Sequence, residues 1–174
     1  DNNEGTVDTY VIKTDASGNE LSRDIHNDIQ VRSGLAISDG GYIFTAVTPY
    51  PWDGWIVRVN NTGTISWSNE YSDSRLYSIE KTSDGGYIAG GSAGGDFWLL
   101  KLDDSGGEDF NMVYDSSSNT HAAYSVGQAN DGGYFAAGYK YNNNGYQDIW
   151  LLKVDSAGAE TNDATYPDGG TYSY

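Results

Sequence analysis

The hydrophobic residues of this chain alternate with a period of two in four short segments. Within residues 97–102, Trp98 and Leu100 point to one face of an extended strand. Leu99 and Lys101 point to the opposite face. The same alternation recurs in residues 10–14, 55–59 and 150–154. Because both faces are largely apolar, the pattern predicts strands of a sheet that lies between two neighbouring sheets.

An Asp-Gly-Gly motif precedes three other strand-like segments, and its copies start about 45 residues apart. Glycine accepts a positive φ, and an aspartate side chain accepts hydrogen bonds from the backbone that follows it. The motif therefore predicts a tight hairpin turn in each repeat. Its members are Asp39, Gly40, Gly41, Asp84, Gly85, Gly86, Asp131, Gly132 and Gly133.

Each repeat divides into four strand-length pieces separated by turn residues. In the best-defined copy these pieces are residues 76–83, 87–91, 97–102 and 108–114. No segment shows the 3.6-residue spacing of apolar residues that a helix requires. A period of about 45 residues that is built from strands is typical of a propeller blade.

We predict an all-β fold in which residues 1–174 form one domain, a β-propeller of about four blades of four-stranded antiparallel sheets. One blade is incomplete within the chain, because the first repeat, residues 1–28, supplies only the last two strands. Tyr172 and Ser173 match the start of a first strand, so residues 167–174 begin the next repeat. The complete repeats are residues 29–71, 72–115 and 116–166.

The composition is acidic, with 25 acidic and 9 basic residues and a net charge of −16. This charge repels phosphate backbones and anionic lipids, so we expect no nucleic-acid partner. There is no long apolar run and no leader sequence, so we expect no membrane insertion, and the start at Asp1 suggests a processed or trimmed chain. Leu, Ile, Val and Phe are few, but 15 Tyr and 5 Trp supply apolar area, which favours a packed core over disorder.

The Asp-Gly-Gly-Tyr of residues 84–87, followed by the Asp-Phe-Trp-Leu-Leu-Lys of residues 96–101, resembles the repeats of secreted or surface β-propellers of bacteria and archaea. These belong to the broad quinoprotein-like and tachylectin-like propeller group. The resemblance implies an extracellular or cell-surface protein. The Asp84 copy lacks the Thr-Trp that ends a sialidase Asp-box, and Trp67 alone matches the outer-strand Trp of quinoprotein repeats. We therefore expect neither sialidase chemistry nor a quinone cofactor.

Each repeat places one cation on the strand face opposite an aromatic residue. The cations are Lys13, Arg58, Lys101 and Lys153, and three of the aromatic residues are Trp55, Trp98 and Trp150. Because a buried cation requires a paired charge, we expect each cation to form a salt bridge between neighbouring blades. The alternative is a ring of cations that binds an anion.

We predict no catalytic residue. Residues 90–94 match the letters Gly-x-Ser-x-Gly of a nucleophile elbow, but that elbow joins a strand to a helix, and here a second strand follows. His26 and His121 lack partners at metal-ligand spacing, so we predict no metal site and no cofactor. The alternative is a structural calcium ion bound by acidic side chains. The candidate ligands are Asp103, Asp104, Glu108 and Asp109.

Aromatic residues outside the repeat register offer a glycan-binding site, because sugar rings stack on aromatic faces. These residues fall in the irregular loops, where binding residues usually lie. They are Tyr50, Trp52, Tyr139, Tyr141 and Tyr146. A sequon at Asn60 falls in a tight turn, which favours an unmodified side chain.

We expect a non-enzymatic structural module that associates with itself. The strand of the incomplete blade that lacks a neighbour invites strand addition by a second copy. We assign this contact to Tyr10, Ile12, Tyr172 and Tyr174. A head-to-tail contact of this kind forms filaments if it does not close. The alternatives are a lectin-like propeller and a fragment of a larger surface propeller.

Overall fold

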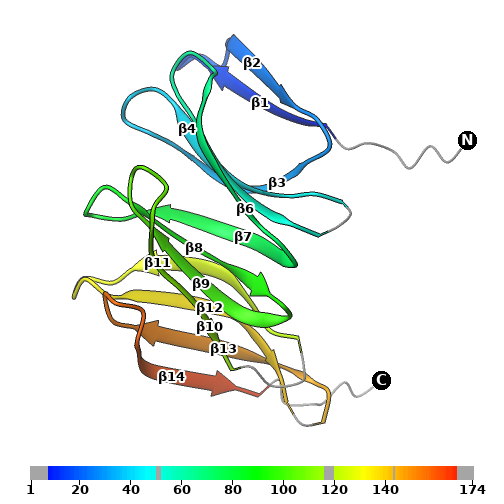
Figure 1. Ribbon diagram of the computed structural model, residues 1–174, viewed down its shortest axis with the longest axis vertical. Helices are drawn as coiled ribbons and strands as arrows, with labels where there is room; N and C mark the ends of the chain where they lie inside the picture. Colours follow the sequence, from blue (N-terminus) through cyan, green and yellow to red (C-terminus); the bar gives the residue numbers. More distant parts are fainter. Residues whose placement is uncertain (1–7, 50–51, 116–119, 143, 168–174) are drawn as a thin grey trace, which may run out of the picture.

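The computed structural model describes residues 8–49, 52–115, 120–142 and 144–167, which form fourteen β-strands and no helix (Figure 1). The strands pair antiparallel in four sheets. Sheet A contains two strands, β1 (Thr9–Thr14) and β2 (Glu20–His26). This described part of the chain contains no helix that is long and apolar enough to cross a membrane.

Sheets B, C and D contain four strands each, and each strand pairs with its neighbours in sequence. Sheet B consists of β3 (Gln30–Ala36), β4 (Tyr42–Val47), β5 (Gly54–Val59) and β6 (Ile65–Tyr71). Sheet C consists of β7 (Ser74–Lys81), β8 (Tyr87–Ala93), β9 (Asp96–Leu102) and β10 (Glu108–Tyr114). Sheet D consists of β11 (Ala122–Gln128), β12 (Tyr134–Tyr141), β13 (Gln147–Val154) and β14 (Glu160–Tyr166).

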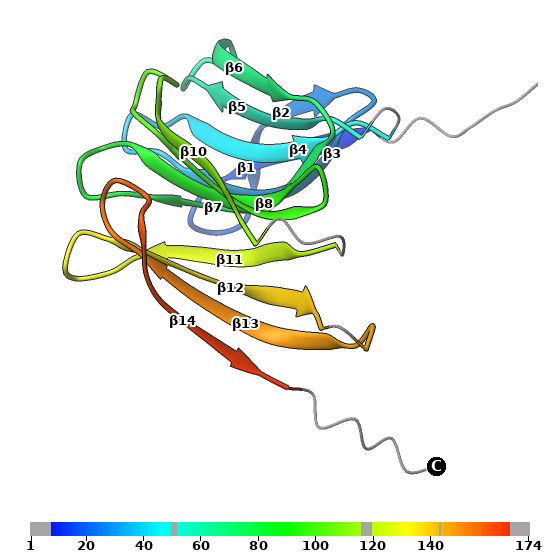
Figure 2. The same cartoon turned by 60° about the horizontal axis from the view of Figure 1, so that its bottom comes forward.

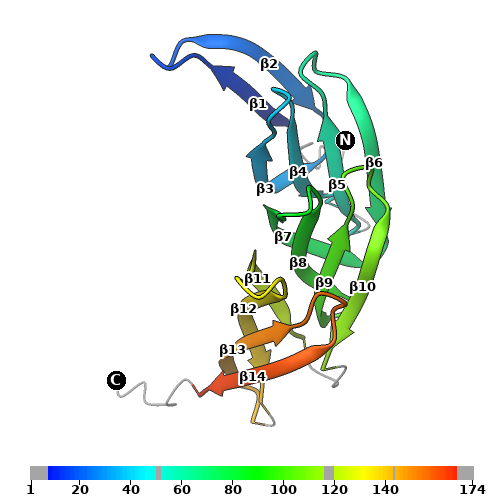
Figure 3. The same ribbon diagram turned by 90° about the vertical axis from the view of Figure 1, so that its left-hand side faces the viewer.

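The sheets stack one behind another as propeller blades do (Figure 2). They follow a curved, open arc, with sheet A at one end and sheet D at the other (Figure 3). The first strands β3, β7 and β11 lie on the concave side of this arc. The predicted all-β fold of four-stranded antiparallel blades is confirmed, as is the incomplete blade, since sheet A has two strands.

The Asp-Gly-Gly motif forms the hairpin between the first two strands of a blade, as the sequence predicts. The first glycine of the motif has a positive φ, which is +94° at Gly85. The second glycine is required by close packing, because a Cβ atom on Gly86 would lie 2.2 Å from the carbonyl oxygen of Leu102. The first strand of this blade ends at Lys81, earlier than expected, because Thr82 N–H donates to the Gly86 carbonyl within the turn.

The hydrophobic core lies between the sheets. The cluster between sheets B and C includes Ile56, Ile79 and Leu100, and the cluster between sheets C and D includes Leu99 and Leu152. Leu99 and Leu100 are adjacent in sequence, and both are fully buried, one in each cluster. The apolar residues on both faces of β9 are therefore explained by burial, which stabilises the fold by about 1.5–3 kcal/mol per large side chain.

Candidate functional site

The repeated cations pair with carboxylates of their own sheet. Arg58 Nη2 lies 2.6 Å from Asp39 Oδ2 within sheet B, and Lys153 pairs with Asp131 within sheet D. The expectation that these cations bridge neighbouring blades is therefore wrong. The reason is the β-hairpin, because it returns the Asp of the Asp-Gly-Gly turn to the end of the third strand. Lys13 differs, because its ammonium donates to the Gly40 carbonyl of the next sheet at 3.4 Å.

Lys101 is the most buried of these cations, with a side chain that is 2% exposed. Its ammonium lies 2.9 Å from Asp84 Oδ2 and 3.0 Å from Asp109 Oδ2, and it donates to the Leu102 carbonyl. Burial disfavours the charged form, but hydrogen bonds with the two carboxylates outweigh it and raise the pKa of Lys101. These contacts hold the Asp84 turn against β9. Because the ammonium already has three acceptors, it is not available to bind an anionic ligand.

The three repeated tryptophans are placed by the same register but differ in their hydrogen bonds. Trp98 Nε1 donates to Asn111 Oδ1 at 2.7 Å, and Trp150 Nε1 donates to Asp163 Oδ2 at 3.2 Å. The equivalent position on β6 is Ser68, whose side chain is too short. Trp55 Nε1 is accordingly a buried donor without an acceptor in the described part of the chain.

The residues considered for chemistry occupy structural positions. Ser92 lies on β8, and a tight turn at Gly94 and Gly95 leads directly into β9, so the predicted hairpin replaces a nucleophile elbow. His26 packs edge-on against Phe44 with ring centroids 4.9 Å apart. Burial lowers its pKa.

His121 directly precedes β11, the first strand of sheet D, and is fully buried. Its Nδ1 accepts a hydrogen bond from the Tyr141 N–H at 3.2 Å, and burial lowers its pKa. The described residues contain no cluster of three or more His, Asp or Glu side chains that would hold a metal ion. Asp103, one of the calcium candidates, uses Oδ1 to accept the N–H groups of Ser105 and Gly107.

The sequon residue Asn60 has the same role in its turn. Its Oδ1 accepts the backbone N–H of Thr62 at 2.9 Å and that of Thr64 at 3.0 Å. The side chain therefore organises the turn between β5 and β6.

The glycan candidates are divided between different places. Trp52 lines a cavity of about 240 Å³ together with Arg75 and Ser92, and the Arg75 guanidinium lies 4.8 Å from the centre of the Trp52 ring. Tyr139 and Tyr141 do not line this cavity. Tyr146 is exposed before β13, and Tyr50 lies outside the described residues.

Tyr139 and Tyr141 lie on β12 rather than in a loop, and they belong to a row of four tyrosine rings. The ring centroids of neighbours are 4.9 Å apart for Tyr77 and Tyr124, 5.4 Å for Tyr124 and Tyr139, and 5.6 Å for Tyr139 and Tyr141. Burial, with the neighbouring tyrosines, raises the pKa of Tyr139 to about 12. Sequence reasoning missed this row because Tyr77 and Tyr124 meet only when β7 and β11 converge on the concave side.

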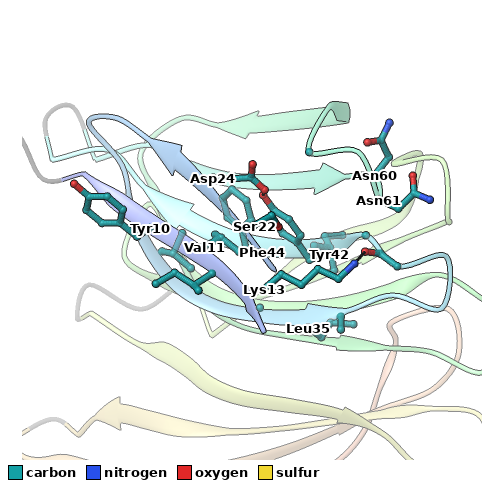
Figure 4. Close-up of a pocket in the computed structure, with 18 of the residues that line it drawn as sticks. Tyr10, Val11, Lys13, Ser22, Asp24, Leu35, Tyr42, Phe44, Asn60 and Asn61 are labelled. Atoms are coloured by element: carbon teal, nitrogen blue, oxygen red, sulfur yellow. Dashed lines mark hydrogen bonds between the residues drawn. The ribbon is translucent and has the colours of Figure 1, made fainter. Parts of the chain in front are cut away.

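The incomplete blade leaves a groove between sheets A and B. Its volume is about 540 Å³, and its lining includes Val11 and Lys13 of β1, Leu35 of β3, and Tyr42 and Phe44 of β4 (Figure 4). In the described residues β1 pairs with β2 alone, so its other edge is open.

The predicted association residues Tyr10 and Ile12 lie on β1, and about half of each side chain is exposed. The other two, Tyr172 and Tyr174, lie outside the described residues. The structure adds a second exposed apolar surface, on sheet D, which sequence reasoning missed. It consists of Phe135, Ile149, Leu151 and Tyr166. The available signal was the repeat itself, because these positions match buried positions of sheet C.

In comparisons with known proteins, no protein-family model and no curated protein matches the sequence.

Proposed function

We propose that this protein is a non-enzymatic structural module of the cell exterior that associates with further copies of itself through its incomplete blade. The observation that carries the proposal is the open edge of β1 beside the groove. A strand with an open edge and apolar residues favours pairing or packing with another chain. The repeat resemblance to secreted and surface propellers supports the extracellular setting.

The occupant follows from how the complete blades pack. In sheet C the first strand β7 contacts β3, β4 and β5 of the preceding sheet, and in sheet D β11 contacts β7, β8 and β9. Sheet A continues this stack before sheet B and supplies two strands in the described residues. Its outer face, which carries the half-exposed Tyr10 and Ile12, is where a preceding blade of this repeat would pack, and a second copy carries such a blade.

Electron microscopy and light scattering of the purified chain test this proposal. We expect assemblies larger than one chain, and we expect the double substitution Tyr10→Asp and Ile12→Asp to release single copies. Both side chains are half exposed, so folding, checked by circular dichroism, should persist. Ile65→Asp, an exposed apolar residue on β6, is the matched control. Single copies of the unmodified chain at every concentration would refute the proposal.

The second candidate function is glycan binding, and the cavity beside Trp52 favours it. An aromatic ring, a guanidinium and the hydroxyl of Ser92 line one small cavity, which is the mixture of apolar and polar groups that sugar sites use. A glycan array tests this candidate. Trp52→Ala should abolish a hit, whereas Tyr146→Ala, which removes an exposed tyrosine that does not line the cavity, should leave the hit unchanged.

A further inference from the structure

The exposed surface of sheet D is a copy of a buried surface of sheet C. Phe97 pairs with Tyr114 across β9 and β10, and Ile149 pairs with Tyr166 across β13 and β14 in the same register. Phe97 is fully buried and Tyr114 is 8% exposed, whereas Ile149 is 57% exposed and Tyr166 is 53% exposed. Each pair combines a large apolar residue on the third strand with a tyrosine on the fourth strand, and the two pairs differ in whether a further sheet covers them.

Within the chain, the surface that covers sheet C belongs to sheet D. Sheet D presents Trp150, Leu152 and Val154 to sheet C, and the Trp150 ring lies 4.6 Å from that of Phe97. The matching positions on β1 are Tyr10, Ile12 and Thr14, because Tyr10 pairs with Ile25 as Trp150 pairs with Thr165. Sheet A therefore carries an aromatic and an aliphatic residue where the internal interface has Trp150 and Leu152.

The outer strand adds a directional contact. Tyr114 donates its hydroxyl to the Gly158 carbonyl of the next blade at 2.6 Å. Gly158 ends the turn between β13 and β14, and Gly18 ends the equivalent turn of sheet A with nearly the same φ, +83° and +84°. The Gly18 carbonyl on sheet A of another copy is thus the equivalent acceptor for the Tyr166 hydroxyl.

The curvature of the arc decides how many copies are needed. Docking sheet D onto sheet A of another copy in the internal geometry continues the same curvature from blade to blade. Such an arc closes, and propellers typically close with four to eight blades. One copy supplies four sheets and its arc is open (Figure 3). Two copies supply eight sheets, the upper end of that range.

We infer that two copies of this chain associate head to tail into a closed ring, with the sheet D surface of each copy covering the sheet A surface of the other. This inference rests on the proposed function and specifies its partner, its two surfaces and its stoichiometry. Both contacts of the ring are heterologous and equivalent, so a two-fold axis relates the copies. Each copy carries a net charge of −16, so association should strengthen as salt screens the repulsion.

A mixing experiment in buffered physiological salt tests the inference. One variant carries Ile149→Asp and Leu151→Asp on sheet D, and the other carries Tyr10→Asp and Ile12→Asp on sheet A. Each variant alone should be a single copy, because every head-to-tail contact then contains one altered surface. Each double substitution should weaken association by at least about thirtyfold, because that is the effect of losing one interface hot spot. Mixed together, the two variants should recover a dimer through the one contact whose surfaces are both intact.

The outcomes separate this inference from the proposed function. Ring-shaped particles of two copies by electron microscopy and recovery on mixing support both. If the sheet D variant still associates, sheet A meets another sheet A, and the inference fails while self-association stands. Filaments of the unmodified chain overturn the closed ring in the same way. Single copies of the unmodified chain overturn both.

Discussion

The interface between sheets C and D and the free face of sheet D present the same residue pattern in two environments. Leu99 on β9 lies against sheet D and is fully buried, whereas Leu151, its counterpart on β13, is 41% exposed. Each repeat therefore carries the apolar face that its successor would cover. The difference shows that exposure at the end of the arc follows from position in the stack and not from composition.

The most damaging change should be truncation at the buried member of this pair. Leu99→Ala removes a fully buried side chain between two sheets and should lower the free energy of unfolding by about 2–5 kcal/mol. Leu151→Ala should cost less than about 1 kcal/mol when the chain is dilute enough to be a single copy. Urea denaturation of both variants measures the difference. Equal losses would show that sheet D is covered even in a single copy.

The paired cations provide the second test. Lys101→Met leaves Asp84 and Asp109 without their partner and should destabilise the fold by about 2 kcal/mol, less than for a fully buried pair because both carboxylates are half exposed. Lys153→Met removes a cation that is 43% exposed, and we expect a much smaller change. Thermal melts of the two variants give the comparison. A larger loss for Lys153→Met would contradict the burial argument.

The third test adds an interaction that one repeat lacks. Ser68→Asn places a side-chain acceptor at the position that Asn111 and Asp163 occupy beside the other tryptophans, so it should satisfy Trp55 Nε1. We expect a gain of about 1 kcal/mol in the free energy of unfolding. Ser68→Ala is the control and should give no gain. A loss with Ser68→Asn would show that the indole is satisfied in another way.

The smallest effect should be on how the stability of the fold depends on pH in acid. Hydrogen bonds from Thr82, then from Lys101 and the Gly86 N–H, lower the pKa of Asp84 to about 2. A lowered pKa in the folded state means that this carboxylate stabilises the fold above its ordinary pKa and that the contribution is lost as the pH falls towards 2. Asp84→Asn should therefore flatten the fall in melting temperature below about pH 4. An unchanged acid profile would contradict this role.

Local patterns were the predictable part of this structure. The Asp-Gly-Gly turns and the two-faced third strands depend on neighbouring residues, so the sequence indicates them directly. The partners of Arg58 and Lys101 were assigned to the wrong blade because face alternation was considered without the return of the hairpin. The pairing of Tyr87 with Leu102 places the Asp84 turn beside Lys101, and that register is set by the folded sheet.

The exposed surfaces were harder to predict because burial depends on what lies beyond a repeat. Ile149 and Phe97 are both large apolar residues at the same position of the repeat. The packing of the sheets shows that Phe97 is covered and that Ile149 is exposed. The row of Tyr77, Tyr124 and Tyr139 likewise needs three strands from two sheets to meet. Contacts between blades therefore require the three-dimensional arrangement, whereas contacts within a hairpin do not.

Sedimentation equilibrium of the unmodified chain tests the central claim most directly, which is that the two end surfaces of the arc bind one another. One chain has a mass of 18.8 kDa. We predict a reversible increase in mass with concentration that reaches a plateau at twice this value. A mass that stays at that of one chain throughout the concentration series would contradict the claim.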